Sequence, residues 1–184
     1  MSGTKVFRGK SRTHILVATA LMTAVTCVLA PMSIAIGPVP ISLTNLVIYM
    51  SLYLLGWKMG TVSCVVYILI GMAGVPVFSG FSGGIGKLVG PTGGYIIGFI
   101  PMALIAGPVI EKSGKRFFHF AAMLAGTAVC YILGTAWFCV VMGTGVLAAL
   151  SACVFPFIPV DIAKMAIVMI VGPMLKKRLR DSGF

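Results

Sequence analysis

The sequence predicts an all-α integral membrane protein, built as a bundle of six transmembrane helices. Two properties of the whole chain predict this class. Of its 184 residues, 59% are hydrophobic and only 9% are charged, whereas charged residues make up roughly a quarter of a typical soluble domain. The mean hydropathy is +1.11, and several apolar runs approach the roughly 20 residues that a helix needs to cross a bilayer.

Six apolar segments follow one another along the chain, and each is expected to form one helix. They cover roughly 13–35, 41–56, 60–76, 92–110, 118–142 and 153–175. Four basic residues before the first segment give it some likeness to a signal peptide, but its apolar stretch is long and no small-residue cleavage site follows, so we expect a retained first helix. The second and third segments are short and separated by "GWKMG", which indicates a tight helical hairpin.

The lysines and arginines predict the orientation of these helices. With six spans, twelve of the fourteen fall on one side, Lys87 falls on the other, and Lys164 lies within a span. Because cytoplasmic loops carry an excess of Lys and Arg, both termini are expected in the cytoplasm, with tails of about 1–12 and 176–184 on a single domain, 1–184. Basic residues at the ends of spans also contact lipid headgroups, so the net charge of +11 does not indicate a nucleic-acid partner.

A long, glycine-rich connection, 77–91, is expected on the outer side between the third and fourth helices. Irregular backbone near membrane depth is tolerated only against protein or a water-filled cavity. The apolar side chains of Phe78, Phe81 and Val89 favour a loop that packs down as a lid. The alternative is a plain flexible connector.

Several catalytic chemistries are excluded by the residues present. The stretch "GGIGK" does not complete a phosphate-binding loop, because Phe81 and Leu88 stand where that motif needs Gly and Ser or Thr. Only Asp161, of three acidic residues, lies in a span, so paired-carboxylate catalysis has no second acid. The two histidines, His14 and His119, are isolated, and the five cysteines form no CxxC pair. The prediction is therefore no enzyme, no metal and no cofactor.

The last apolar segment carries two charges, Asp161 and Lys164, after Pro159. Proline suits the first turn of a helix, so Asp161 is expected in that turn, where the helix dipole favours a negative charge. The spacing of three residues places Lys164 on the same face. Intramembrane charges are costly and usually face the protein interior or a cavity, which favours an outward-open pocket for a small, mostly apolar solute with a polar head and a carboxylate. A self-satisfied ion pair near the interface is the alternative.

Other polar residues start the second and fourth segments and could converge on the same pocket, although each alone is more often a cap or a packing residue. They are Ser42, Thr44 and Asn45, then Thr92 and Tyr95, together with the outer cation Lys87. In the first segment, Ala20 and Ala24 form a small-xxx-small pair that allows close helix approach. That pair serves either internal packing or docking of another membrane protein.

Three stretches of the sequence resemble the BioY family, the biotin-specific substrate-capture components of energy-coupling-factor (ECF) transporters. They are "GPVPISLTNL" (37–46), "GVPVFSGFSGGIGKLVGPTGGYIIGF" (74–99) and "PFIPVDIAKM" (156–165). The sequence departs from the family pattern at Thr44, where Gln is common, and at Lys87, where an apolar residue is expected.

The resemblance implies a six-helix bundle in the cell membrane with a biotin site near its outer face. Asp161 and Lys164 match the family's aspartate–lysine pair, and the loop at Gly83 and Gly84 would cover the ligand, with Phe78 beside it. Ala20 and Ala24 match the face presented to a transmembrane coupling protein, which recruits two cytoplasmic ABC-type ATPases.

The resulting expectation is a high-affinity biotin receptor that captures its ligand outside and delivers it inward with an ATP-driven module. The alternatives are a capture component for another vitamin, or a small channel or structural membrane protein. A channel would line a continuous path with polar groups, whereas here they gather near one face.

Overall fold

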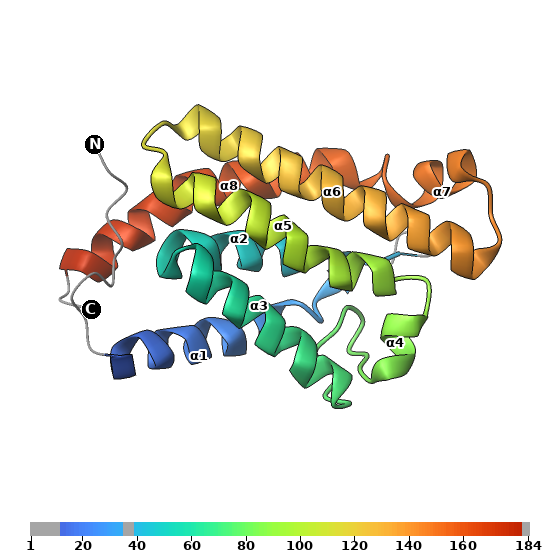
Figure 1. The fold of residues 1–184 in the computed structure, drawn as a ribbon, viewed down its shortest axis with the longest axis horizontal. Helices are drawn as coiled ribbons and strands as arrows, with labels where there is room; N and C mark the ends of the chain where they lie inside the picture. Colours follow the sequence, from blue (N-terminus) through green and yellow to red (C-terminus); the bar gives the residue numbers. More distant parts are fainter. Residues whose placement is uncertain (1–11, 35–38, 182–184) are drawn as a thin grey trace.

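The computed structural model describes residues 12–34 and 39–181. Most of the predicted N-terminal tail, the last three residues of the C-terminal tail and the first two residues of the motif at 37–46 lie outside the described residues. Within the described ranges the fold is all-α apart from one two-residue β-ladder. The elements are α1 (Arg12–Leu29), β1 (Ser33–Ile34), β2 (Ile41–Ser42), α2 (Thr44–Leu55), α3 (Trp57–Met72), α4 (Ile85–Val89), α5 (Gly93–Lys112), α6 (Arg116–Met142), α7 (Val146–Cys153) and α8 (Phe157–Asp181) (Figure 1).

Each of the six predicted apolar segments contains a helix: α1, α2, α3, α5, α6 and α8. Four of them, in the described part of the chain, are long and apolar enough to cross a membrane: α1, α5, α6 and most of α8. The other two are shorter, with 12 residues in α2 and 16 in α3. At 1.5 Å per residue, α2 falls well short of a hydrocarbon core of about 30 Å.

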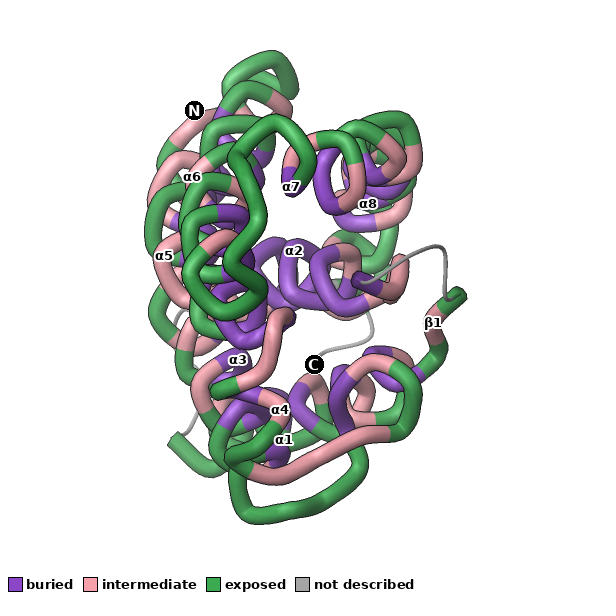
Figure 2. Tube along the Cα trace, turned by 90° about the vertical axis from the view of Figure 1, so that its right-hand side faces the viewer, coloured by how far each residue is buried: buried purple, intermediate pink, exposed green. Residues whose placement is uncertain are grey.

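The shortness of α2 is compatible with a membrane because other helices surround it. It packs against α1, α3, α5 and α8, and Figure 2 shows it as a purple, buried helix in the middle of the bundle. Helix ends and irregular backbone at membrane depth are tolerated when protein covers them. The bundle therefore has one inner helix and a ring of longer outer ones.

The predicted hairpin between the second and third segments is tight: α2 ends at Leu55, α3 begins at Trp57, and Gly56 alone joins them. Gly56 has φ of +80°, and a Cβ there would lie 2.6 Å from a carboxylate oxygen of Glu111. Glycine is therefore required both for its conformation and for the close approach. The Glu111 carboxylate accepts a hydrogen bond from the Trp57 backbone N–H at 3.0 Å, which caps the start of α3.

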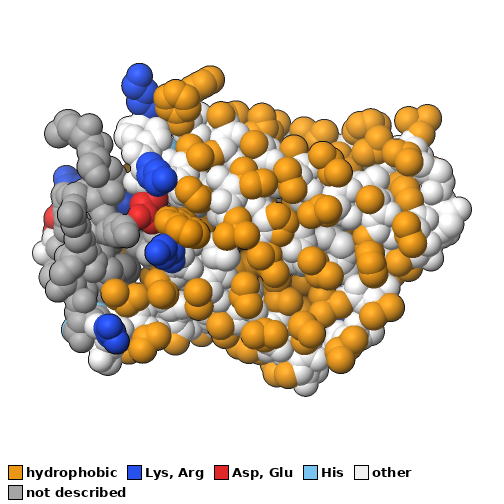
Figure 3. Space-filling view, viewed as in Figure 1, with side chains coloured by type: hydrophobic (Ala, Val, Ile, Leu, Met, Phe, Trp, Pro, Cys, Tyr) orange, Lys and Arg blue, Asp and Glu red, His pale blue; other side chains and the backbone are white. Residues whose placement is uncertain are grey.

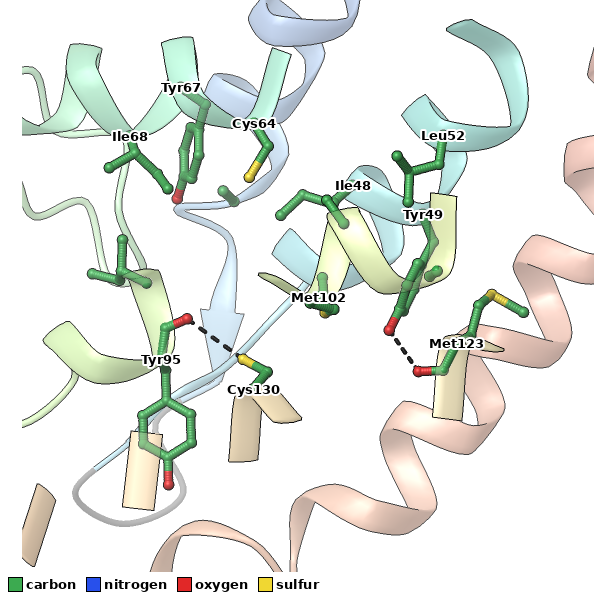
Figure 4. Packing of buried hydrophobic residues seen from close by; sticks show 14 of the residues in the cluster. Ile48, Tyr49, Leu52, Cys64, Tyr67, Ile68, Tyr95, Met102, Met123 and Cys130 are labelled. Atoms are coloured by element: carbon green, nitrogen blue, oxygen red, sulfur yellow. Dashed lines mark hydrogen bonds between the residues drawn. The ribbon is translucent and has the colours of Figure 1, made fainter. Parts of the chain in front are cut away.

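Buried apolar and aromatic side chains of α2 form the centre of the core. Figure 4 shows Ile48, Tyr49 and Leu52 packed among residues from α3, α5 and α6. The Tyr49 hydroxyl donates to the backbone carbonyl of Met123 at 2.7 Å (Figure 4). This hydrogen bond ties the inner helix to α6.

Four parts of the fold differ from the sequence prediction. The first helix ends at Leu29 instead of near 35, because Ser33–Ile34 pairs with Ile41–Ser42 in an antiparallel hairpin. The connections predicted at 77–91 and 143–152 contain the helices α4 and α7, and the leucines and alanines of α7 are strong helix formers. The last helix begins at Phe157, two residues before Pro159, so Asp161 is not in its first turn and the predicted stabilisation there by the helix dipole is wrong.

Basic side chains gather at one end of the molecule. Figure 3 shows blue Lys and Arg side chains at the end where α1 begins and α8 ends, while apolar side chains cover most of the rest of that face. The α2–α3 and α5–α6 turns lie at this same end (Figure 1). An apolar belt beside a basic rim is typical of a protein embedded in a bilayer.

Candidate functional site

A cavity lies between the starts of α2, α5 and α8 and the middle of α6. The space between its walls is about 670 Å³, a figure that includes the open solvent at its mouth. Much of its wall is aromatic or apolar, with Tyr67, Phe99, Met102 and Phe157 among the lining residues. Such a wall suits a ligand with a substantial apolar surface.

The two charges of the last helix meet inside this cavity. The Lys164 ammonium and an Asp161 carboxylate oxygen lie 2.9 Å apart, and the residues are only 6% and 5% exposed. Both line the cavity. The prediction that the spacing of three residues places them on one face is confirmed, and they do not face lipid.

The hydrogen-bonding capacity of Lys164 is fully used by the protein. Besides Asp161, its ammonium donates to the Ser42 backbone carbonyl at 2.6 Å and to the Asn45 side-chain oxygen at 3.2 Å. An ammonium has three donors, and these three acceptors take them all. Lys164 therefore ties α8 to the start of α2 and holds the Asp161 carboxylate in place.

Asp161 retains the capacity to accept further hydrogen bonds. One carboxylate oxygen accepts a hydrogen bond from Lys164, and the other accepts one from the Tyr131 hydroxyl at 2.6 Å. A carboxylate has about four acceptor positions, so about two remain for donors in the cavity. Sequence reasoning missed Tyr131; the available signal was a phenol within the apolar segment 118–142, where a hydroxyl needs a partner.

Three further predicted site residues line the cavity: Thr44, Asn45 and Tyr95. The Thr44 and Ser42 hydroxyls lie 2.9 Å apart, and the Tyr95 hydroxyl lies 3.2 Å from that of Thr135. Thr44 and Tyr95 thus have partners within the protein, while Asn45 supports Lys164.

The other predicted binding residues do not line the cavity. Lys87, Phe78, Gly83 and Gly84 are not among the described residues that line it. Phe78 is fully buried, and its ring meets that of Tyr67 edge-on with centroids 5.7 Å apart. Because Tyr67 lines the cavity, Phe78 supports the wall from behind. A Cβ at Gly83 would lie 2.4 Å from the Val75 carbonyl oxygen, so this glycine lets the loop fold closely on itself.

The loop packs down at Phe78 but not at the other two apolar side chains for which packing was predicted. Phe81 is 69% exposed and Val89 is 62% exposed. Phe78 and Ser82 pair across a β-bridge, which leaves Phe81 at the tip of a turn with φ of 54°. In α4 the buried side chain is that of Leu88. Its neighbour Val89 lies on a different face of the helix, because successive helix positions are about 100° apart.

The small-residue pair of the first helix is on the outside. Ala20 and Ala24 are both exposed, and α1 buries only Ala18 and three threonines. Internal packing, one of the two roles that the sequence left open for this pair, is therefore wrong for the isolated chain.

Comparison with known proteins gives one consistent answer. The sequence profile of the BioY family matches residues 4–181. The chain is 36% identical over 162 residues to the biotin transporter BioY of Thermotoga maritima, covering 88% of this chain and 95% of that one. It is 39% identical over 157 residues to a probable biotin transporter BioY of Pyrococcus horikoshii, covering 85% and 93%.

A solved structure shares the fold. It is a crystal structure of the S-component for biotin from an ECF-type ABC transporter, with a TM-score of 0.81, 30% sequence identity, and coverage of 90% of this chain and 92% of that one. The chain therefore belongs to the BioY family.

Proposed function

We propose that this chain is the biotin-capture subunit of an ECF transporter, a multi-pass protein of the cell membrane that takes biotin from outside and delivers it inward. The observation that carries the proposal is the buried Asp161–Lys164 pair, set in the wall of a largely apolar cavity in a chain of the BioY family. Its relatives are transporters by name, in agreement with the prediction that the chain is not an enzyme.

The chemistry of the pair suits the ureido ring of biotin. The ring N–H groups are donors for the remaining acceptor positions of Asp161. The Asn45 side-chain amide, whose oxygen already serves Lys164, carries N–H donors for the ring carbonyl. Lys164 acts as a positioning residue that holds the carboxylate in place. The fused rings then lie against the aromatic wall.

The topology we propose has six crossings, with both termini in the cytoplasm and residues 1–184 forming one domain. The basic rim at the end where α1 begins and α8 ends supports this orientation, which makes the cavity open outward. The short helix α2 completes its crossing inside the bundle, with protein around it, while α3 makes its crossing with apolar side chains such as Val62 and Leu69 exposed on its outer face.

We further propose that Ala20 and Ala24 dock a transmembrane coupling protein, which is joined to two cytoplasmic ABC-type ATPases. Small exposed residues on α1 let a partner helix come close, and the chain shows no nucleotide-binding loop of its own in sequence. We propose that Lys87 is a cation near the outer end of the site. We propose that the loop around Gly83 and Gly84 covers the ligand.

Ligand choice separates this function from the alternatives. The detergent-solubilised full chain is titrated with biotin, thiamine and riboflavin, and only biotin is expected to bind. Binding of another vitamin would identify a capture component of different specificity. Binding of none would favour a channel or a structural protein.

A further inference from the structure

The start of α5 carries a polar group without a partner. Thr92 precedes this helix, is 7% exposed, and lines the cavity. Its hydroxyl is the one buried side-chain N or O atom of the described residues that makes no hydrogen bond. Buried polar atoms are nearly always paired, and an unpaired one costs stability, so a ligand that enters the cavity is the natural partner.

The position of Thr92 gives this hydroxyl a particular chemical preference. A threonine before a helix usually caps it by accepting from a first-turn N–H, but Thr92 makes no such side-chain bond. The α5 helix that follows has 20 residues, so its N-terminus carries the positive end of a substantial dipole. Backbone carbonyls already accept from the N–H groups of Gly93, Tyr95 and Ile96, which leaves the Thr92 hydroxyl as the donor at this point. A hydroxyl donor at such a helix start suits an anion.

The other polar end of the cavity is chemically opposite. There the fixed groups include the Asp161 carboxylate, and the Lys164 cation is already satisfied by three protein acceptors. A ligand carboxylate placed beside Asp161 would meet a like charge and no available ammonium donor. The anionic end of the ligand therefore belongs elsewhere in the cavity.

We infer that the Thr92 hydroxyl, at the positive end of the α5 dipole, binds the carboxylate of the substrate, while its ureido ring occupies the Asp161 end. This inference rests on the proposed function and adds the orientation of the ligand. It assigns Thr92 as a specificity residue that selects ligands with an anionic tail. Tyr95, Ile96 and Phe99 of the same helix line the cavity and flank the aliphatic part of the tail.

The test compares two proteins with two ligands. Thr92→Val removes the hydroxyl at nearly constant volume, and biotin methyl ester removes the charge of the ligand. Because hydrogen bonds to charged groups are the stronger ones, Thr92→Val should lower the affinity for biotin by about tenfold to a hundredfold. The affinity for the methyl ester should change by less than about threefold. Thr92→Ser, which keeps a hydroxyl, should bind both ligands nearly as the parent does.

Matched variants make the outcome specific. Thr61→Val makes the same change in α3, outside the cavity lining, and should alter neither affinity. Thermal stability of the ligand-free Thr92→Val protein should not fall, since the variant removes an unpaired buried hydroxyl. If Thr92→Val lowered the affinity for both ligands equally, or did not lower the affinity for biotin, the inference would be overturned.

The remaining outcomes separate the inference from the function. If Lys87→Gln weakened the binding of biotin but not of its methyl ester, and Thr92→Val did not, the anion site would lie at α4. That result would overturn the assignment to Thr92. Biotin binding by the parent without any Thr92 dependence refutes the orientation alone. A parent chain that binds no biotin refutes the proposed function and this inference with it.

Discussion

The first two helices of the chain, α1 and α2, differ sharply in how much of each is buried in the bundle. In α2, ten of twelve residues are buried, whereas in α1 only four of eighteen are. Figure 2 shows α2 enclosed on its sides and α1 at the periphery. The composition of both is apolar, so hydropathy alone does not separate them.

The difference in burial between the two helices matches what each of them contributes to the protein. The start of α2 supplies Asn45 and the backbone of Ser42 just before it, and both hold Lys164. This helix forms the floor of the site and must be fixed. The exposed small residues of α1 have no such role within the chain and suit a surface that another helix covers. The proposed ligand site and the proposed docking surface thus lie on separate helices.

Breaking the ion pair that α2 supports should cause the greatest change. Asp161→Asn leaves Lys164 as a buried charge without its counter-ion, and Lys164→Ala does the reverse; removing one partner of such a pair costs about 3–5 kcal/mol. Biotin affinity should fall at least a hundredfold in both variants, by equilibrium binding to the purified chain.

Loss of folding must be separated from loss of the site. The double variant Asp161→Asn with Lys164→Met removes both charges, and replacing a buried pair by groups of similar size is often tolerated. It should express and melt like the parent yet bind no biotin. Unchanged affinity in the two single variants would return the pair to a purely structural role.

A pair of leucine truncations tests the burial contrast itself. Leu52→Ala in α2 empties a fully buried position and should destabilise the chain by about 2–5 kcal/mol. Leu21→Ala in α1 changes an exposed side chain and should leave thermal stability in detergent nearly unchanged. Similar losses in both would show that α1 is packed as tightly as α2.

The docking surface is tested by adding volume in place of removing it. Ala20→Leu or Ala24→Leu should reduce biotin uptake by cells that carry the coupling protein and ATPases, by about tenfold if overpacking costs 1–3 kcal/mol. Binding to the purified chain should not change. Ala125→Leu, the same substitution at an exposed position of α6, is the control, and a loss of uptake there would argue against a specific face.

The smallest change is expected from the removal of one hydroxyl group in α2. Tyr49→Phe removes the hydroxyl that contacts the Met123 carbonyl at 2.7 Å and Thr127 at 2.6 Å. Stability should fall by about 0.5–1.5 kcal/mol, measured by thermal unfolding, with biotin affinity kept. A greater loss of affinity than of stability would place Tyr49 in the site.

The sequence predicted the helices better than their surroundings. Apolar runs located all six long or inner helices, and the spacing of Asp161 and Lys164 located the ion pair. Their partners Tyr131 and Ser42 come from segments 30 and 122 residues away in sequence, and no local pattern encodes such a pairing. Ser42 contributes a backbone carbonyl, which any residue could provide.

The outer connections were predicted least well, for a physical reason. Short helices such as α4 and α7 and the turn at Phe81 depend on contacts with distant parts of the chain as well as on local sequence. Their residues lie at the end opposite the basic side chains, where apolar side chains can face either the protein or its surroundings, and hydropathy is the same in both cases. Phe78 and Phe81, three residues apart, show the two outcomes.

A structure determined by experiment with biotin bound decides whether capture takes place where α2 and α8 meet. The ligand is expected in the cavity, with its ureido ring within hydrogen-bonding distance of the Asp161 carboxylate and with Lys164 still bound to Asn45. A ligand seated elsewhere, or an Asp161–Lys164 pair turned toward lipid, would contradict this account.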